Sequence, residues 1–292
     1  MKTYLKDVRH AVKRCVLRVT PSLYYFINSY RHQRYCKKKF RKFQDEFKEK
    51  VYGQVPISVL AGPFNGLKYY NKNVWGLITN KWIGSYEEEL HDVLSKIIRL
   101  NYPRIIDVGA AEGYYAVGLA NKCPASTVLS FDIDPIARIR QRQLRKLNGV
   151  TNLNIQAYCY PKTLSESIIP NSTLLICDVE GYEYILLDIG NVPKLKSTDI
   201  LVEIHGYENL AANKVREIIK SRFADSHRIQ VFQATPRDPQ QYLQKVSNLK
   251  DISPSLMREA MDEHRFASQE WLWMEAESGL DLVCENAERS FL

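Results

Sequence analysis

The segment from Ile105 to Gly113 constrains the fold of this 292-residue chain more than any other segment. Its apolar start predicts a short buried strand, and the spacing of apolar residues after it predicts a helix from Tyr114 to Asn121. Gly109 lets the backbone turn tightly after the strand, and Gly113 lets a ligand lie close to the start of the helix. The segment therefore predicts a strand–turn–helix unit with a ligand site at the turn.

The same alternation of strand and helix continues from residue 104 to near the end of the chain. Short apolar runs predict strands at 105–108, 127–132, 153–157, 174–177, 200–205, 229–233 and 271–275. Helical spacing predicts helices at 85–100, 114–121, 135–147, 182–187, 211–223 and 255–262, the first of them opened by a capping box of Ser85 and Glu88. This order predicts an α/β fold with a doubly wound, mostly parallel seven-stranded sheet of the Rossmann-like kind, preceded by a helical N-terminal extension.

The residues of the glycine turn favour a cationic cofactor. The spacing G-x-x-x-G differs from the G-x-G-x-x-G of a dinucleotide site. Asp107 can balance positive charge, and S-adenosylmethionine carries both a sulfonium and an ammonium group. We therefore expect this turn to bind S-adenosylmethionine through Asp107, Gly109, Ala110, Ala111, Glu112 and Gly113.

Acidic residues also follow the second strand. An acid about 20–25 residues after the glycine turn can bind both ribose hydroxyls of a nucleotide, and we assign this role to Asp132. Ile133, next to it, is expected to contact the same cofactor. Asp134 precedes Pro135, so we expect it to cap the next helix.

The fourth strand ends in Asp178, with Glu180 two residues on. Because ligands of such sheets bind at the carboxyl ends of the strands, we expect both acids near the cofactor and the methyl acceptor. Glu183 is expected in the first turn of the next helix, where the helix dipole favours an acid.

Glu203 and His205 lie near the end of the fifth predicted strand, on one face because they are two residues apart. Three roles are open. His205 is a general base whose ring is held by Glu203 or Asp178. Alternatively, Asp178 and Glu203 hold a divalent ion such as Mg²⁺. In the third role, Glu203 and His205 pair with each other and serve the structure only.

From about Gly62 to Glu275 the chain resembles the FkbM family of methyltransferases. The resemblance is carried by Ile106–Gly109, Glu112–Tyr115, Phe131–Pro135, Asp178–Glu183 and Val202–His205. It implies the class I methyltransferase fold, S-adenosylmethionine as the donor, and methylation of oxygen, often on sugars or other secondary metabolites. Asp132 stands where many relatives have Glu, and either acid can bind a ribose.

These residues favour methyl transfer to a hydroxyl, and the resemblance implies a hydroxyl of a saccharide or glycan precursor. Such transfer needs an aligned acceptor and a group that removes its proton. Trp75, Trp82, Tyr69 and Tyr70 are aromatic residues that can stack on a sugar, and core packing explains them equally well.

Three other functions compete with this one. A nucleic-acid methyltransferase would use the basic N-terminal segment, although the Asn-Pro-Pro-aromatic motif of amino-group methylation is missing. A nicotinamide-dependent dehydrogenase is disfavoured by the glycine spacing, and NAD binding would reveal it. A non-catalytic S-adenosylmethionine-binding module would not need Asp178, Glu203 and His205.

Positive charge is concentrated at the N-terminus. Residues 1–50 hold 15 Lys and Arg against 4 Asp and Glu, a net charge of +11, so the rest of the chain carries −3 of the total of +8. We therefore expect a basic, largely helical extension at 1–60 and the methyltransferase domain at 61–292. The extension is suited to peripheral contact with an anionic membrane through residues 1–50, whereas nucleic acid is the less favoured partner; a solvated charged helix is the alternative.

The cysteines and the apolar segments indicate the compartment. Six cysteines occur without a C-x-x-C pair or zinc spacing, which fits a reducing environment. The stretch from Val19 to Tyr30 is shorter than the roughly 20 residues of a membrane-spanning helix, and no secretory signal is expected. We expect a cytoplasmic protein that can associate with a membrane surface.

Overall fold

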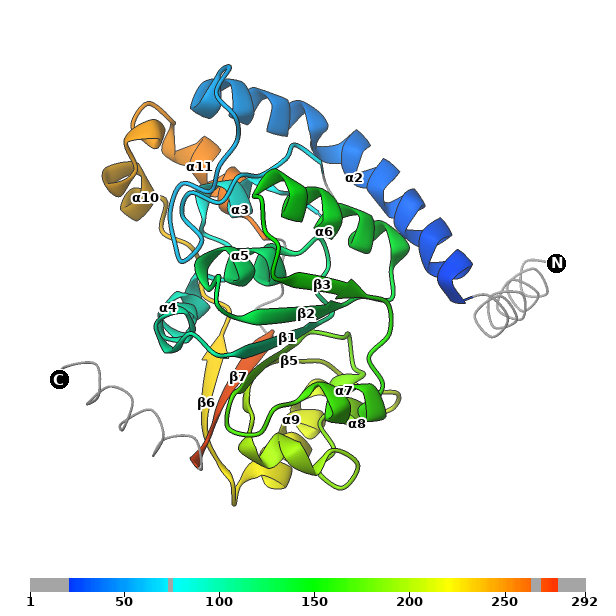
Figure 1. Ribbon diagram of the computed structural model, residues 1–292. Coiled ribbons are helices and arrows are strands. Elements are labelled where there is room, and N and C mark those ends of the chain that lie inside the picture. Colours follow the sequence, from blue (N-terminus) through cyan, green and yellow to red (C-terminus); the bar gives the residue numbers. More distant parts are fainter. Residues whose placement is uncertain (1–20, 73–75, 264–268, 278–292) are drawn as a thin grey trace.

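A seven-stranded sheet forms the centre of the computed structural model, which describes residues 21–72, 76–263 and 269–277. The strand order is β3-β2-β1-β4-β5-β7-β6 (Figure 1). The strands are β1 (Arg104–Val108), β2 (Thr127–Phe131), β3 (Leu153–Gln156), β4 (Thr173–Cys177), β5 (Asp199–Ile204), β6 (His227–Gln233) and β7 (Glu270–Ala276). Strands β1 to β5 are parallel, and β7 is antiparallel to both β5 and β6. This confirms the doubly wound, mostly parallel sheet.

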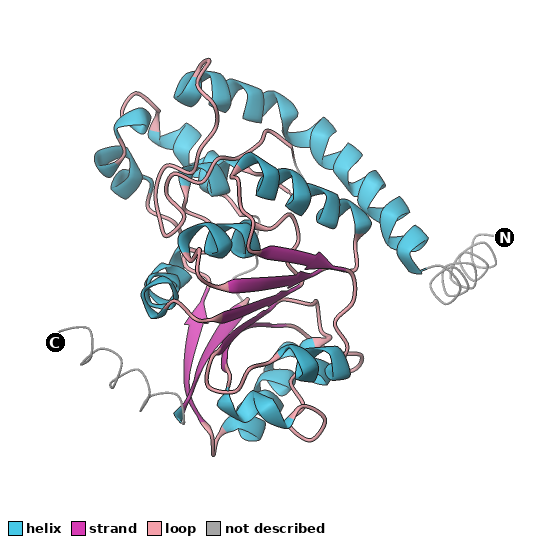
Figure 2. Cartoon of the chain, in the orientation of Figure 1, coloured by secondary structure: helices cyan, strands magenta, loops and turns pink. Residues whose placement is uncertain are grey.

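Helices cover both faces of the sheet. The α-helices are α2 (Pro21–Tyr52), α3 (Thr79–Ile83), α4 (His91–Leu100), α5 (Tyr114–Lys122), α6 (Pro135–Leu147), α7 (Pro161–Ser167), α8 (Glu183–Leu186), α9 (Ala212–Phe223), α10 (Pro239–Lys245) and α11 (Pro254–Met261). Short 3-10 helices are η1 (Glu88–Leu90), η2 (Pro193–Ser197) and η3 (Ser247–Leu249). In Figures 1 and 2 the helices α7, α8 and α9 lie on one side of the sheet, and the others lie on the opposite side.

Two hydrophobic layers follow from the alternation of side chains along the strands. Ile105, Ile176 and Leu201 pack with α2, α3, α4, α5 and α11, and we call this the upper layer. Ile106, Cys177 and Val202 pack with α7, α8 and α9 as the lower layer. Such continuous burial on both faces is what the near-continuous apolar runs of the strands require.

The helix predicted at 85–100 was partly wrong. Regular helix starts at His91, after η1, and no side chain caps either element. The hydroxyl of Ser85 lies 3.4 Å from the carbonyl oxygen of Asn80, so the predicted capping box does not form. The helices α3, α7 and α10 were not predicted, because five to seven residues are too few to show a helical period.

The basic helix α2 packs against the sheet domain. Its buried residues recur at helical spacing, at Ser29, Cys36, Gln44, Phe47 and Val51. Phe47 and Val51 belong to the upper hydrophobic layer. The residues of α2 that are exposed include the basic ones from 31 to 42. The charged face thus points to solvent while the opposite face completes the core.

Polar contacts join α2 to helix α6. Ser29 donates to the carboxylate of Asp134, and the guanidinium of Arg140 lies 3.4 Å from the side-chain oxygen of Gln33. Charge alone placed residues 1–50 apart from the domain, yet residues 21–52 contribute to its packing. Among the described residues, no helix is both long and apolar enough to cross a membrane.

The cysteines that the structure describes are unpaired and buried: Cys36, Cys123, Cys159 and Cys177. Burial raises the pKa of the Cys159 thiol to about 12, so this group is not a reactive thiolate. Cys15 and Cys284 lie outside the described residues.

Candidate active site

The glycine turn between β1 and α5 has a backbone that other residues adopt with difficulty. The φ angles of Gly109 and Gly113 are 86° and 96°. A Cβ atom on Gly109 would lie 1.6 Å from the carbonyl oxygen of Asp178. Glycine at 109 is therefore required for the turn to approach the end of β4. Ala111 also has a positive φ, of 45°, and its N–H donates to the carboxylate of Asp132.

Asp132 holds this turn from the end of β2. One of its carboxylate oxygens accepts a hydrogen bond from the N–H of Ala111 at 2.8 Å, and the other accepts from Asp134 at 2.7 Å. Burial raises the pKa of this carboxyl to about 7. Asp134 caps α6 by accepting from Ile136 at 2.8 Å, as predicted, and Ile133 is 40% exposed beside it.

Asp107 is a buried acid at the end of β1. Its Oδ2 atom has no hydrogen-bond partner among the residues that the structure describes. Burial, together with the negative charges of Asp178 and Asp132, raises the pKa of Asp107 to about 8. A carboxyl oxygen without a partner at a glycine turn is suited to a cationic ligand, which would restore its ionised form.

Glu112 lies in the glycine turn, and its side chain is bound by residues outside the turn. Its carboxylate forms a buried ion pair with Lys81, and Tyr69 donates to the same oxygen at 3.2 Å. The Glu112 side chain is thus held by residues of the upper layer. Ala110, on the other side of Ala111, is buried.

Asp178, Glu203 and His205 converge at the ends of β4 and β5. One ligand atom from each lies within 4.8 Å of the other two. The Nε2 atom of His205 lies 3.9 Å from Asp178 and 3.8 Å from Glu180. The side chain of Glu180 is largely exposed, whereas Glu203 is buried. The convergence expected from strand order and side-chain alternation is therefore found.

Glu183 lies beside the other ring nitrogen of His205, Nδ1, and bonds the backbone N–H of the same residue. Its Oε1 atom lies 3.3 Å from Nδ1 and accepts a hydrogen bond from the backbone N–H of His205 at 2.7 Å. Its Oε2 atom accepts from the N–H of Gly181 at 2.8 Å, and the side chain is fully buried. The sequence pattern predicts Glu203 or Asp178 as the partner of the ring and Glu183 only in the first turn of α8, where it also lies.

These acids govern the titration of His205. Burial lowers the pKa of the imidazole, but the contact with Glu183 and the charges of Asp178 and Glu180 outweigh it, so the pKa is raised. With Nδ1 against Glu183, Nε2 faces the acids at the sheet edge. This orientation leaves one ring nitrogen available for proton transfer.

Two aromatic side chains on the same face carry buried polar atoms. Trp271 of β7 is directly opposite Glu203 of β5, and the Trp271 and Tyr115 ring centroids are 6.2 Å apart. The indole N–H of Trp271 and the hydroxyl of Tyr115 have no hydrogen-bond partner among the described residues. Tyr115 lies in one of the segments that carry the family resemblance, but the sequence patterns gave neither side chain a role in the site. Of the aromatic residues considered for sugar stacking, Trp82 and Tyr69 are buried in the upper layer and Trp75 lies outside the described residues.

Comparison with known proteins adds distant structural likenesses. No protein-family model and no curated protein matches the sequence. A candidate O-methyltransferase from Klebsiella pneumoniae is 12% identical, with a TM-score of 0.44 over 85% of this chain and 99% of that one. An O-methyltransferase from Bacillus cereus, solved with S-adenosylhomocysteine, is 9% identical over 52% of this chain and 76% of that one, with a TM-score of 0.42.

An rRNA methylase from Streptococcus thermophilus is 11% identical over 64% of this chain and 96% of that one, with a TM-score of 0.43. Similarity this distant does not identify a function. The fold assignment rests on the strand order itself, and the functional argument rests on the site described above.

Proposed function

We propose that the chain is an S-adenosylmethionine-dependent O-methyltransferase of the class I fold. The observation that carries the proposal is the orphaned, buried carboxyl oxygen of Asp107 at a glycine turn, one strand away from the His205 cluster. A cationic amino-acid end favours the ionised form of Asp107, whereas the negative charge of a pyrophosphate opposes its ionisation. The proposal thus distinguishes this cofactor from NAD.

The residues present fit S-adenosylmethionine. Asp107 is suited to its ammonium group, and Asp132, whose carboxylate is oriented by two N–H groups, is suited to the ribose hydroxyls. The turn from Gly109 to Gly113 allows close backbone approach. When bound, S-adenosylmethionine supplies a methyl group on a positively charged sulfur.

The chain's own residues supply the base. Glu183 bonds the backbone N–H of His205 and lies 3.3 Å from Nδ1, and in this arrangement Nε2 takes the proton of the acceptor hydroxyl. The imidazolium that results is stabilised by Asp178 and Glu180, which lie 3.9 and 3.8 Å from Nε2. A raised pKa makes His205 a stronger base once it is neutral.

A divalent ion is the second candidate role for the same side chains. Carboxylate oxygens of Asp178 and Glu203 with an imidazole nitrogen of His205 form a suitable ligand set, and oxygen ligands favour Mg²⁺ or Mn²⁺. His205 would then be a ligand. Metal analysis of the purified protein and titration with Mn²⁺ decide between the roles, because a general base alone predicts no stoichiometric metal and no Mn²⁺ binding.

We further propose an FkbM-type enzyme whose acceptor is a hydroxyl of a saccharide or glycan precursor. The support is the set of motifs from Asp107 to His205 and the buried polar atoms of Tyr115 and Trp271, which suit a polar acceptor. Assaying methyl transfer to a panel of sugars, small phenols and RNA distinguishes this acceptor from nucleic acid.

The cofactor is tested by parallel titrations with S-adenosylhomocysteine and NAD⁺. We expect saturable binding of the first and none of the second. Binding of NAD⁺ in place of S-adenosylhomocysteine would instead make the chain a dehydrogenase.

A further inference from the structure

Glu87 is a buried acid that approaches the glycine turn from the segment before β1. Glu87 is fully buried, and its backbone is in the left-handed region, with a φ of 49°. The ring of the preceding residue, Tyr86, packs on Tyr114 and Tyr115, with centroids 5.3 and 6.4 Å away. Since Tyr114 directly follows Gly113, Glu87 is held against the start of α5.

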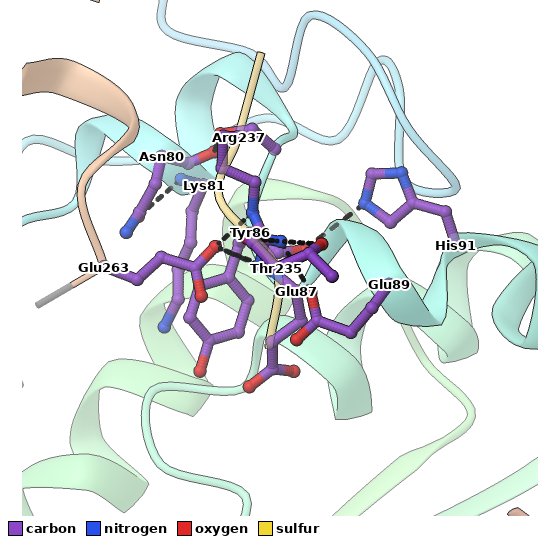
Figure 3. Close-up of polar contacts among 10 residues, drawn as sticks. Asn80, Lys81, Tyr86, Glu87, Glu89, His91, Thr235, Arg237 and Glu263 are labelled. Atoms are coloured by element: carbon purple, nitrogen blue, oxygen red, sulfur yellow. Dashed lines mark hydrogen bonds and ion pairs between the residues drawn. The ribbon is translucent and has the colours of Figure 1, made fainter. Parts of the chain in front are cut away.

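The backbone of Glu87 is fixed by a buried ion-pair network (Figure 3). Its N–H donates to the carboxylate of Glu263 at 3.0 Å. Arg237 holds Glu263 at 2.8 Å and Glu89 at 2.6 Å, and all three of these side chains are at most 8% exposed. A left-handed conformation is costly for a residue with a side chain, so it persists where the surroundings enforce it. The network therefore fixes the backbone from which the Glu87 side chain extends.

The Glu87 side chain extends away from Arg237 in Figure 3. Its negative charge raises the pKa of Asp107, after the larger effects of burial, Asp178 and Asp132, and it also raises the pKa of Tyr114. The buried Glu87 carboxylate thus acts electrostatically on a residue at each end of the turn, in line with the packing of Tyr86 on Tyr114. Lys81, which lies over the Tyr86 ring, forms its ion pair with Glu112.

We propose that Glu87 is the second carboxylate, with Asp107, that binds the α-ammonium group at the amino-acid end of S-adenosylmethionine. An ammonium has three N–H donors and can therefore bond to carboxylates from two segments. Arg237 and Glu263 are positioning residues that act through the backbone of Glu87. This inference rests on the proposed function, and it names the group of the cofactor that the segment before β1 recognises.

The test compares two ligands that differ only at this end. S-adenosylhomocysteine has the amino-acid end, and 5′-methylthioadenosine has the nucleoside without it. Calorimetry with Glu87→Gln should show at least about a tenfold loss of affinity for S-adenosylhomocysteine, since losing one hydrogen bond to a charged group lowers affinity by about that factor. The affinity for 5′-methylthioadenosine should stay within about twofold.

Glu88→Gln is the neighbouring control, and it should change neither affinity. Glu87→Asp keeps the charge with a shorter reach, and it should recover part of the lost affinity; it also serves as the test variant if Glu87→Gln does not fold. Glu263→Gln should lose less affinity for S-adenosylhomocysteine than Glu87→Gln does, and it should likewise keep its affinity for 5′-methylthioadenosine, because Glu263 acts through Glu87.

Equal loss for both ligands, or no loss for either, overturns the role of Glu87 while leaving the cofactor assignment intact. Failure of the unaltered protein to bind S-adenosylhomocysteine overturns the proposed function itself, and the role of Glu87 with it.

Discussion

Cofactor binding should release a proton from the Asp107 carboxyl. Burial and the nearby charges of Asp178 and Asp132 raise the pKa of Asp107 to about 8, so at pH 7 it holds about 0.9 of a proton before the ligand binds. An ammonium group at Oδ2 favours the ionised form, and this proton then leaves. Asp132, with a pKa of about 7, adds up to about 0.5 of a proton if the ribose hydroxyls donate to its ionised form.

The release can be measured by calorimetry of S-adenosylhomocysteine binding at pH 7 in phosphate and in Tris, whose ionisation enthalpies differ. The change in binding enthalpy between the buffers gives the number of protons. We expect about 0.9–1.4 protons for the unaltered protein and about 0.9 fewer for Asp107→Asn. At pH 8 the share from Asp107 should fall to about half a proton.

Asp225→Asn is a suitable control, because this exposed acid lies between α9 and β6, at the edge of the sheet where β5 and β6 begin. It should leave the proton count unchanged. Tight binding without proton release at pH 7, or the same release in Asp107→Asn, would refute the placement of the ammonium beside Asp107.

Three further predictions concern the base, stability and the basic helix. His205→Ala should lower turnover by about 10²–10⁴-fold, and full activity of this variant at every pH would leave His205 a structural role only. Activity of the unaltered enzyme should rise with pH through a midpoint above 6.5, and Glu183→Gln should move this midpoint to lower pH. Since the pKa of Asp107 is higher in the folded than in the unfolded protein, its contribution to stability is lost as pH rises from about 4 to about 8. In differential scanning calorimetry, ligand-free Asp107→Asn should therefore melt at least about 2–4 °C above the unaltered protein at pH 8, and the difference should be smaller at pH 5. Vesicles containing anionic lipid should bind the chain less as salt rises, and reversing the charges of Lys37–Lys39 should weaken binding further, whereas equal binding by the variant would remove the described part of α2 from the membrane contact.

The sheet and the edge that carries the site could be predicted from local sequence. Each strand is a short apolar run, and parallel strands end at the same edge, so the acids that follow these runs meet there. Alternation along β5 placed Glu203 and His205 on one face, and the structure confirms that they meet Asp178.

Contacts between distant segments could not be predicted in this way. The role of Glu183 depends on the approach of His205, 22 residues away, and nothing in the local helical pattern signals it. The backbone N–H of Glu87 is bonded by Glu263, 176 residues away, and the left-handed backbone of Glu87 is unusual for glutamate. The packing of α2 was hidden because its high net charge obscures the buried stripe that includes Cys36 and Phe47.

The central claim is that the turn and Asp132 bind S-adenosylmethionine. Calorimetry with S-adenosylhomocysteine on the unaltered protein, Asp132→Ala and the control Asp225→Asn tests it most directly. Asp132→Ala removes the acceptor for the ribose hydroxyls and for the N–H of Ala111, and each charge-assisted bond is worth about 1.5–3 kcal/mol. We predict at least about a tenfold loss of affinity for Asp132→Ala and no loss for Asp225→Asn. Unchanged affinity in a folded Asp132→Ala protein would contradict the assignment of the cofactor to this site.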